Sequence, residues 1–191
     1  MKTSFLLLCL LSVTLTGLCQ TTVSVEYTLR YNLFQSRYEV YARPNTSQSA
    51  FSWGSSQITV VTPSSLTDVA ITAVTTVAGG PWGDLSRAYN VQGSDFHGFA
   101  SNGTPVDLVA NTETLLFTFT LPGNVCLPGL RLYVNGSDPN SAAPGMGGGD
   151  FTNTLYSAGD PNGAFNLYVG NYANTGTFCT ACNLSAPTLS K

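Results

Sequence analysis

The sequence is poor in charge, and in lysine above all. Between Lys2 and Lys191 it contains no lysine, so five arginines are the only other cations. Charged residues make up 9% of the chain, against about 25% in an average soluble domain. This composition excludes a basic surface for nucleic acid and a polybasic patch for membranes. The exterior must be built from Ser, Thr, Asn, Gly and Tyr, and such a surface repels neighbouring molecules only weakly.

Catalytic signatures are also missing. The chain has one histidine, His97, and no GxSxG, HExxH or GxxxxGK[ST] motif. We expect His97 to be a surface or structural residue in a loop or an edge strand. Glu26, Glu39 and Glu113 alternate with or precede apolar strand positions, as solvated surface carboxylates do. The sequence therefore predicts that the protein is not an enzyme.

No segment keeps a helical period over the length that a stable helix needs. Apolar and polar residues instead alternate, as in Thr22–Tyr31, where the odd-numbered positions predict a core-facing row. The predicted strands are Thr22–Tyr31, Tyr38–Arg43, Gln57–Thr62, Val69–Val77, Thr114–Leu121, Leu130–Val134 and Ala164–Val169. Short strands separated by Gly, Pro and Asn predict an all-β fold, an antiparallel β-sandwich of immunoglobulin-like or jelly-roll type.

The N-terminus has the pattern of a secretion signal. Lys2 is followed by an apolar stretch too short to span a bilayer comfortably, and small residues at Gly17 and Cys19 suit a signal-peptidase site. We predict a signal peptide over residues 1–19, one domain over 20–183, and a tail or linker start over 184–191. The mature protein is expected to be secreted or at the cell surface, with no membrane span. An acylated Cys19 is the alternative.

Three cysteines remain after this cleavage: Cys126, Cys179 and Cys182. Export favours a disulfide, and a bridge from Cys126 would tie the C-terminal segment to the body of the domain. Cys179 is the preferred partner and Cys182 the alternative. Their Cys-Thr-Ala-Cys spacing also occurs in redox and zinc sites, but here it lies in a C-terminal segment and lacks further ligands.

A Gly-, Pro- and Asx-rich region interrupts the strand pattern between Asp138 and Asp160. We interpret it as a long surface loop followed by a turn, and long loops often carry function. Its oxygen atoms are hard ligands of the kind that Ca²⁺ binds. The candidate calcium ligands are Asp138, Asn140, Asp150, Asp160 and Asn162. The same residue types also form turns without a metal, and no other cofactor is expected.

Exposed aromatic side chains would give sugar rings a flat surface on which to stack. Trp53, Trp82 and Tyr172 lie in or beside turns and are the candidates for carbohydrate binding. Any one tryptophan of a sandwich belongs more often to the core.

A set of strand and turn motifs covers most of the mature chain. The motifs are Tyr38-Glu-Val-Tyr-Ala-Arg-Pro44, Glu113-Thr-Leu-Leu-Phe-Thr-Phe119, Cys126 with Gly129-Leu-Arg-Leu132, Asp138-Pro-Asn-Ser141, and Tyr168-Val-Gly-Asn-Tyr172 before Cys179. Together they resemble modules in large secreted surface proteins of gliding-type Gram-negative bacteria. The resemblance implies a cohesin-like or carbohydrate-binding-type β-sandwich located outside the cell.

We therefore expect a secreted, non-enzymatic module for adhesion, scaffolding or assembly through protein–protein association. The expected partners are the protein itself, other surface proteins or extracellular polysaccharide, and not nucleic acid. A carbohydrate-binding module and a calcium-dependent structural module are the alternatives.

Overall fold

The computed structural model describes residues 22–160 and 165–180. The predicted signal peptide and tail lie outside these residues, as do Cys182 and Asn162. The strands are β1 (Val25–Asn32), β2 (Arg37–Pro44), β3 (Gln48–Phe51), β4 (Trp53–Pro63), β5 (Val74–Thr76), β6 (Gly83–Val91), β7 (Ser94–Ser101), β8 (Val106–Leu108), β9 (Thr114–Phe119), β10 (Arg131–Leu132), β11 (Thr154–Ser157) and β12 (Tyr168–Asn171). A short 3-10 turn, η1 (Pro122–Asn124), is the only helical element of the described residues. None of the described residues forms a helix long and apolar enough to cross a membrane.

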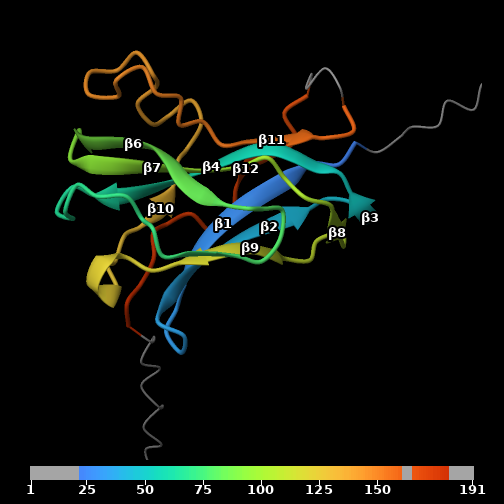
Figure 1. The fold of residues 1–191 in the computed structure, drawn as a ribbon, viewed down its shortest axis with the longest axis horizontal. Helices are drawn as coiled ribbons and strands as arrows, with labels where there is room; N and C mark the ends of the chain where they lie inside the picture. The colour runs from blue at the N-terminus through green and yellow to red at the C-terminus, as the bar shows by residue number, and fades with distance from the viewer. Residues whose placement is uncertain (1–21, 161–164, 181–191) are drawn as a thin grey trace, which may run out of the picture.

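The strands build two five-stranded sheets, with β3 and β8 as a separate small ribbon (Figure 1). The first sheet has the order β12-β1-β2-β9-β5. The second has the order β10-β4-β7-β6, and β11 also pairs with β4. All neighbouring strands are antiparallel except β12 and β1, which are parallel. The all-β prediction is confirmed, and the paired sheets are consistent with the predicted β-sandwich. The parallel pair departs from a purely antiparallel arrangement.

The alternation seen in the sequence places the apolar row of β1 in the core. Val25, Tyr27 and Leu29 are buried, whereas Arg30 is exposed. In β9 the alternation is broken by Leu116, which is also fully buried. The register between β2 and β9 shifts at this level, and such an irregularity lets a residue that is out of phase turn inward.

Aromatic side chains connect the two sheets. The ring of Phe99 on β7 lies 5.0 Å from that of Phe117 and 5.3 Å from that of Phe119, both on β9 (centroid distances). Tyr38 stacks on Phe119 at 5.0 Å, and Trp82 packs against Phe117 at 4.9 Å. Burying each such side chain contributes about 1.5–3 kcal/mol, so this cluster is the main link between the sheets.

The hairpin of β6 and β7 is absent from the predicted strands. Gln92 and Gly93 connect the two strands with φ angles of 52° and 80°, and two successive positive φ angles match the twist of a two-residue hairpin. The strands contain the buried polar residues Asp84, Asp95 and His97. Because polar residues occupy buried positions, the hydrophobic alternation that marks a strand is lost.

Other predicted strands are present but differ in extent. Val69–Val77 is a strand only over β5, because the residues before it leave the sheet and cover the side of the sandwich. There the buried Ile71 donates its backbone N–H to Asp84 Oδ2 at 2.8 Å. Leu130–Val134 shortens to β10, and the last strand, β12, begins at Tyr168 and continues to Asn171. Ala164, where this strand was predicted to begin, lies outside the described residues.

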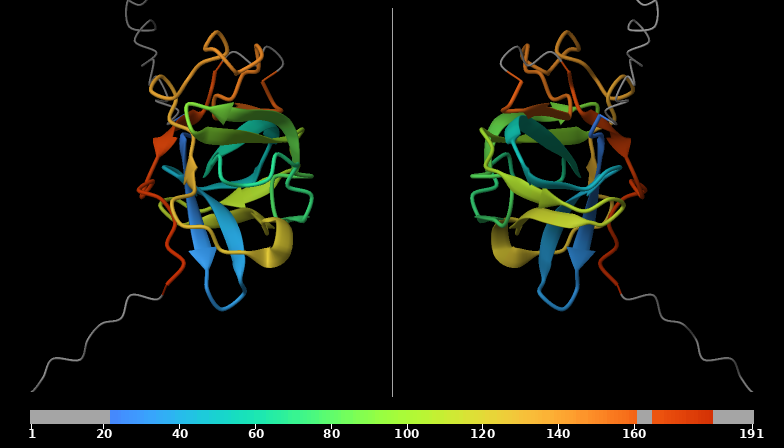
Figure 2. Two further views of the ribbon diagram at one scale, coloured as in Figure 1. Left: turned by 90° about the vertical axis from the view of Figure 1, so that its left-hand side faces the viewer. Right: turned by 90° about the vertical axis from the view of Figure 1, so that its right-hand side faces the viewer.

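The Gly-rich region after β10 packs on the outer face of the second sheet (Figures 1 and 2, orange). It forms a second apolar cluster, whose buried members are Val61, Ala88, Val91, Phe96, Tyr133, Met146 and Phe151. Phe151 lies 5.8 Å from Phe96 between ring centroids. Gln57 on β4 donates to the carbonyl oxygens of Asp150 and Thr152 at 2.8 and 3.2 Å. The region predicted as a long surface loop is therefore packed against the sheet.

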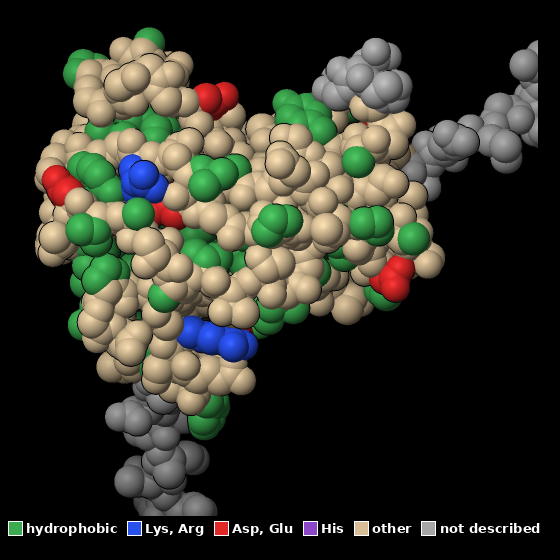
Figure 3. All heavy atoms as spheres, viewed as in Figure 1, with side chains coloured by type: hydrophobic (Ala, Val, Ile, Leu, Met, Phe, Trp, Pro, Cys, Tyr) green, Lys and Arg blue, Asp and Glu red, His purple; other side chains and the backbone are tan. Residues whose placement is uncertain are grey.

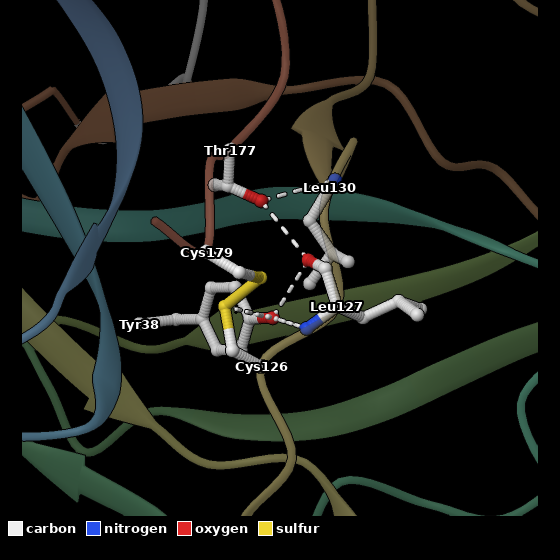
Figure 4. The surroundings of a disulfide bond; sticks show 6 residues. All are labelled: Tyr38, Cys126, Leu127, Leu130, Thr177 and Cys179. Atoms are coloured by element: carbon white, nitrogen blue, oxygen red, sulfur yellow. Dashed lines mark hydrogen bonds between the residues drawn. A yellow bond between two sulfur atoms is a disulfide. The ribbon is translucent and has the colours of Figure 1, made fainter. Parts of the chain in front are cut away.

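The disulfide is the predicted one, Cys126–Cys179 (Figure 4). Beside it, the hydroxyl of Tyr38 donates to the carbonyl of Leu127 at 2.9 Å and accepts its N–H at 2.7 Å. Burial raises the pKa of Tyr38 to about 12. Thr177 Oγ1 also donates to the carbonyl of Leu127, at 3.3 Å. The bridge and these bonds hold the C-terminal segment against β2.

Asparagine side chains hold the segment around β12 against β10. The N–H of Leu132 donates to Asn174 Oδ1 at 2.7 Å, and Asn174 Nδ2 donates to the carbonyl of Leu132 at 2.8 Å. Asn171 Nδ2 donates to the carbonyl of Tyr133 at 2.8 Å. These amides take the place of backbone ladder bonds, so the two sheets are joined along this side.

Candidate association surface

The outer face of the first sheet carries all three glutamates and three of the five arginines of the chain. We call it the arginine–glutamate face; it consists of Glu26, Arg30, Asn32, Arg37, Glu39, Tyr41, Arg43, Glu113 and Tyr172. In the register of β1 and β2, Glu26 is opposite Arg43 and Arg30 is opposite Glu39. Arg43 Nη2 donates to Glu26 Oε2 at 2.7 Å. Opposite charges at directly paired positions attract across the strands.

Glu113 is the centre of this network. It binds both terminal nitrogens of Arg30, Nη1 at 2.8 Å and Nη2 more closely, and it accepts the hydroxyl of Tyr172 at 2.9 Å. The guanidinium of Arg43 lies over the Tyr172 ring, 3.9 Å from its centroid. Burial raises the pKa of Glu113, but the hydrogen bonds from Arg30 and Tyr172 outweigh burial and hold that pKa below its usual range.

A second group of bonds converges on Glu39. Arg37 Nη2 donates to its Oε1 at 2.8 Å, Asn32 Nδ2 to the same oxygen at 3.1 Å, and the Tyr41 hydroxyl to Oε2 at 2.6 Å. The Glu39 side chain is only 8% exposed, so the prediction of a solvated carboxylate is wrong for this residue. Burial raises its pKa, yet the hydrogen bonds from Tyr41, Arg37 and Asn32 bring the net pKa below normal.

Thr28 shows how closely this layer is packed. It lies on the same face between Glu26 and Arg30, opposite Tyr41, and yet it is fully buried. The long side chains above it therefore form a continuous cover. Three of the five arginines and all three glutamates of the chain are in this layer, while much of the surface in Figure 3 is neutral.

Comparison with known proteins identifies no relative of the chain. No family model, curated protein or solved structure matches it at a significant level.

The sequence did contain one signal for the arginine–glutamate face. Charges of alternating sign occupy every second or fourth position of β1 and β2, as at Glu26 and Arg30, and mark the outward row; the register that pairs them is visible only in the structure.

The two candidate tryptophans for sugar stacking are in the core, which corrects that prediction. Trp53 is 1% exposed and its Nε1 donates to Ser56 Oγ at 3.0 Å. Trp82 is 6% exposed and its Nε1 donates to the carbonyl of Ala78 at 2.8 Å. Neither ring offers a face to a ligand. Tyr172 does lie on the surface, but Arg43 covers one side of its ring.

The oxygens proposed for calcium have other partners in the structure. Asp138 is bound by both terminal nitrogens of Arg131 at 2.6 Å and by the N–H of Val134 at 2.7 Å. Burial raises the pKa of Asp138, but these bonds, Arg131 first, bring the net pKa below its usual value.

Turn bonds account for other calcium candidates. Asp150 Oδ1 accepts from the backbone and the hydroxyl of Thr152, and Asn140 Oδ1 accepts from the N–H of Ala142. Asp160 stands in the turn after β11, where its N–H donates to the carbonyl of Ser157 at 3.1 Å. Among residues 22–160 and 165–180, no group of three or more His, Cys, Asp or Glu could hold a metal ion. Calcium binding remains a prediction.

His97 is in neither a loop nor an edge strand, contrary to expectation. It lies on β7, between β4 and β6, and is 2% exposed. Its Nδ1 is 3.0 Å from Asp84 Oδ2, the oxygen that also accepts the N–H of Ile71. The pair thus anchors the covering segment to the hairpin, and the burial of the ring keeps it away from a substrate.

Proposed function

We propose that the chain is a secreted, non-enzymatic module that associates with other proteins at the cell surface through the arginine–glutamate face. One observation carries the proposal. Of the two broad outer sheet faces, the second is covered by the segment containing Met146 and Phe151, while the first carries a patterned set of ionic and aromatic side chains. The disulfide favours an oxidising compartment, in line with the export signal predicted from the sequence.

The state of these side chains before binding favours recognition. Arg30, Glu39 and Glu113 are already held by hydrogen bonds within the domain. The ordering of side chains is a major cost of association, and this cost is small here because few further side chains must be ordered when a protein binds. Alternating charges select a complementary pattern and fix the orientation of the complex. Because the face has three arginines and three glutamates, its net charge is zero, and it selects a partner by the local pattern of charges at close range.

An exchanged ion pair tests the proposal without loss of the fold. In the double variant Arg30→Glu with Glu113→Arg, the pair and the net charge remain but the pattern is inverted. Exposed pairs contribute only about 0–1 kcal/mol, so the variant should keep its unfolding temperature within a few degrees. We expect its retention on the surface of producing cells to fall at least about tenfold, equivalent to 1.4 kcal/mol. Asp68→Arg, an exposed change outside the face, is the control.

Two results would overturn the proposal. One is a failure of association through this face: either the double variant is retained as fully as the wild type, or the wild type itself stays monomeric and is retained on no surface. The other is turnover of a glycoside, ester or peptide substrate by the purified chain, because a non-enzymatic module should convert none.

A carbohydrate partner is the second candidate, supported by Tyr41 and Tyr172 on the open face. Aromatic rings beside arginine and glutamate are suited to stack on a sugar and bond its hydroxyl groups. Retention on a polysaccharide panel, lost in Tyr172→Ala but not in Tyr156→Ala, would favour this candidate. Retention that proteolysis of the cell surface abolishes would favour a protein partner.

A further inference from the structure

The turn between β1 and β2 presents a phenylalanine to solvent. Phe34 is 103% exposed and its neighbour Leu33 is 40% exposed. The turn itself is held in place, because Asn32 Oδ1 accepts the backbone N–H groups of Phe34 and Gln35 at 3.1 Å each. Figures 1 and 2 show the hairpin extending beyond the body of the domain. A fully exposed aromatic side chain on a fixed, projecting turn is suited to act as an anchor in a partner's pocket.

An apolar recess lies at the other end of β1. It has a volume of about 270 Å³ and is lined by residues just before β1 and by residues of and before β12. Val23 and Leu167 are buried within it, whereas Phe165 and Val169 are 72% and 63% exposed at its edge. No lining residue is charged. Exposed apolar side chains around such a recess mark an interaction site more often than a scattered surface residue does.

The recess and the turn lie at opposite ends of β1. The eight residues of β1 separate them by about 26 Å at 3.3 Å per residue, so Phe34 cannot reach the recess of its own chain. We propose that Phe34 of one copy inserts into the recess of a second copy. The two surfaces match in chemistry, since both are apolar and uncharged, and the recess is large enough for a phenyl ring.

A contact between two different surfaces does not close on itself by two-fold symmetry. Each copy keeps a free turn at one end and a free recess at the other, so addition continues into an open, head-to-tail chain. The inference goes beyond the proposed function, because the contact uses the turn and the recess and not the arginine–glutamate face. One phenylalanine buries on the order of 150–250 Å², well below the roughly 1,200 Å² of a stable interface. The contact is therefore weak in dilute solution and effective where copies are crowded on a surface.

Two single variants, mixed, test the contact. Phe34→Ser removes the anchor but leaves the recess, and Val169→Glu places a charge in the recess but leaves the anchor. Sedimentation velocity from micromolar to millimolar protein should show that the wild type forms concentration-dependent oligomers. Each variant alone should associate at least about tenfold more weakly. The equimolar mixture should form dimers and nothing larger, because only one productive contact exists in it.

Controls separate this contact from general stickiness and from misfolding. Leu85→Ser alters another apolar side chain, 69% exposed on β6, and should leave the oligomers unchanged. Phe165→Ser is a second recess variant, at a position outside the strands, and should behave as Val169→Glu does. Leu85 and Phe165 are both exposed, so the unfolding temperatures of their variants should stay near that of the wild type.

The outcomes distinguish the head-to-tail contact from the proposed function. Wild-type oligomers that persist in Phe34→Ser, or a mixture that sediments as the sum of its components, would refute head-to-tail insertion and leave the proposed function standing. A wild type that is monomeric throughout, but is retained on cells through the arginine–glutamate face, would also refute insertion alone. A monomer without any retention would refute both.

Discussion

Truncating Phe151 to alanine is expected to lower the free energy of unfolding by about 3–5 kcal/mol. Phe151 is 2% exposed and packs on Phe96 of β7, with their ring centroids 5.8 Å apart. Burial of the side chain contributes about 1.5–3 kcal/mol, and the cavity left between the Gly-rich region and the sheet accounts for the rest. Urea unfolding measures the change, with Trp53 and Trp82 as buried fluorescent reporters.

The matched control is Phe34→Ala, which removes the same atoms from a fully exposed side chain. It should change the free energy of unfolding by no more than about 0.5 kcal/mol. If Phe151→Ala costs less than about 1 kcal/mol, the region after β10 is not docked on the second sheet. That sheet would then present an open face of its own, and the reason for assigning association to the first sheet would be lost.

Further predictions concern the disulfide, acid and metal. Cys126→Ser opens the bridge to Cys179 across a sequence separation of 53 and should lower the free energy of unfolding by roughly 4 kcal/mol on the chain-entropy estimate; an unchanged urea midpoint would contradict this. The pKa of Glu113 is below its usual range because hydrogen bonds, Arg30 first, outweigh burial. Its stabilisation is therefore complete above the unfolded-state pKa of about 4.3 and is lost as the pH falls through the lower folded-state pKa. Glu113→Gln should flatten this acid loss, and an unaltered stability–pH curve would refute the assignment. Because Asp138 is already bound by Arg131, EDTA should leave the unfolding temperature unchanged, whereas an increase on adding Ca²⁺ would support the calcium alternative.

Strands with one apolar and one polar row were predictable from the sequence. β1 and β2 follow this rule, because their inward residues meet the opposite sheet and their outward residues form the arginine–glutamate face. β4 and β9 are buried on both faces over much of their length. The β6–β7 hairpin does not follow it. Asp84 and His97 occupy buried positions, and the contact between Asp84 Oδ2 and His97 Nδ1 forms only when the two strands are paired. A local sequence pattern contains no information on a partner in another strand. The polar residues of β6 and β7 therefore prevented the prediction of both strands.

For the candidate site, the sequence predicts which residues of β1 lie on the outer face of the sheet. It does not predict which of these residues contact each other. Alternation assigned Glu26 and Arg30 to the outer row of β1, and the structure confirms it. The partner of Arg30 is Glu113, which lies 83 residues away and before a different strand. Neither strand order nor register can be derived from the alternation itself. The prediction of exposed tryptophans was wrong for a related reason. Turn-forming residues flank Trp53 and Trp82 in the sequence, but both rings point into the core.

The outer faces of the two sheets show why the chain needs so little charge. On the second sheet, outward positions such as Val61, Ala88 and Phe96 are apolar and would be a large sticky surface, and the region containing Met146 and Phe151 covers them. The first sheet has no such cover, so its outer positions must face water, and this is where three of the arginines and the glutamates stand. The glutamates and three of the five arginines are thus placed where the fold leaves a broad sheet face uncovered. It follows that a partner on this face replaces water around a pre-arranged polar layer, whereas the apolar turn at Phe34 offers hydrophobic burial. Mutations of the two sites should accordingly differ in salt dependence, because added salt screens contacts of the first kind and not of the second.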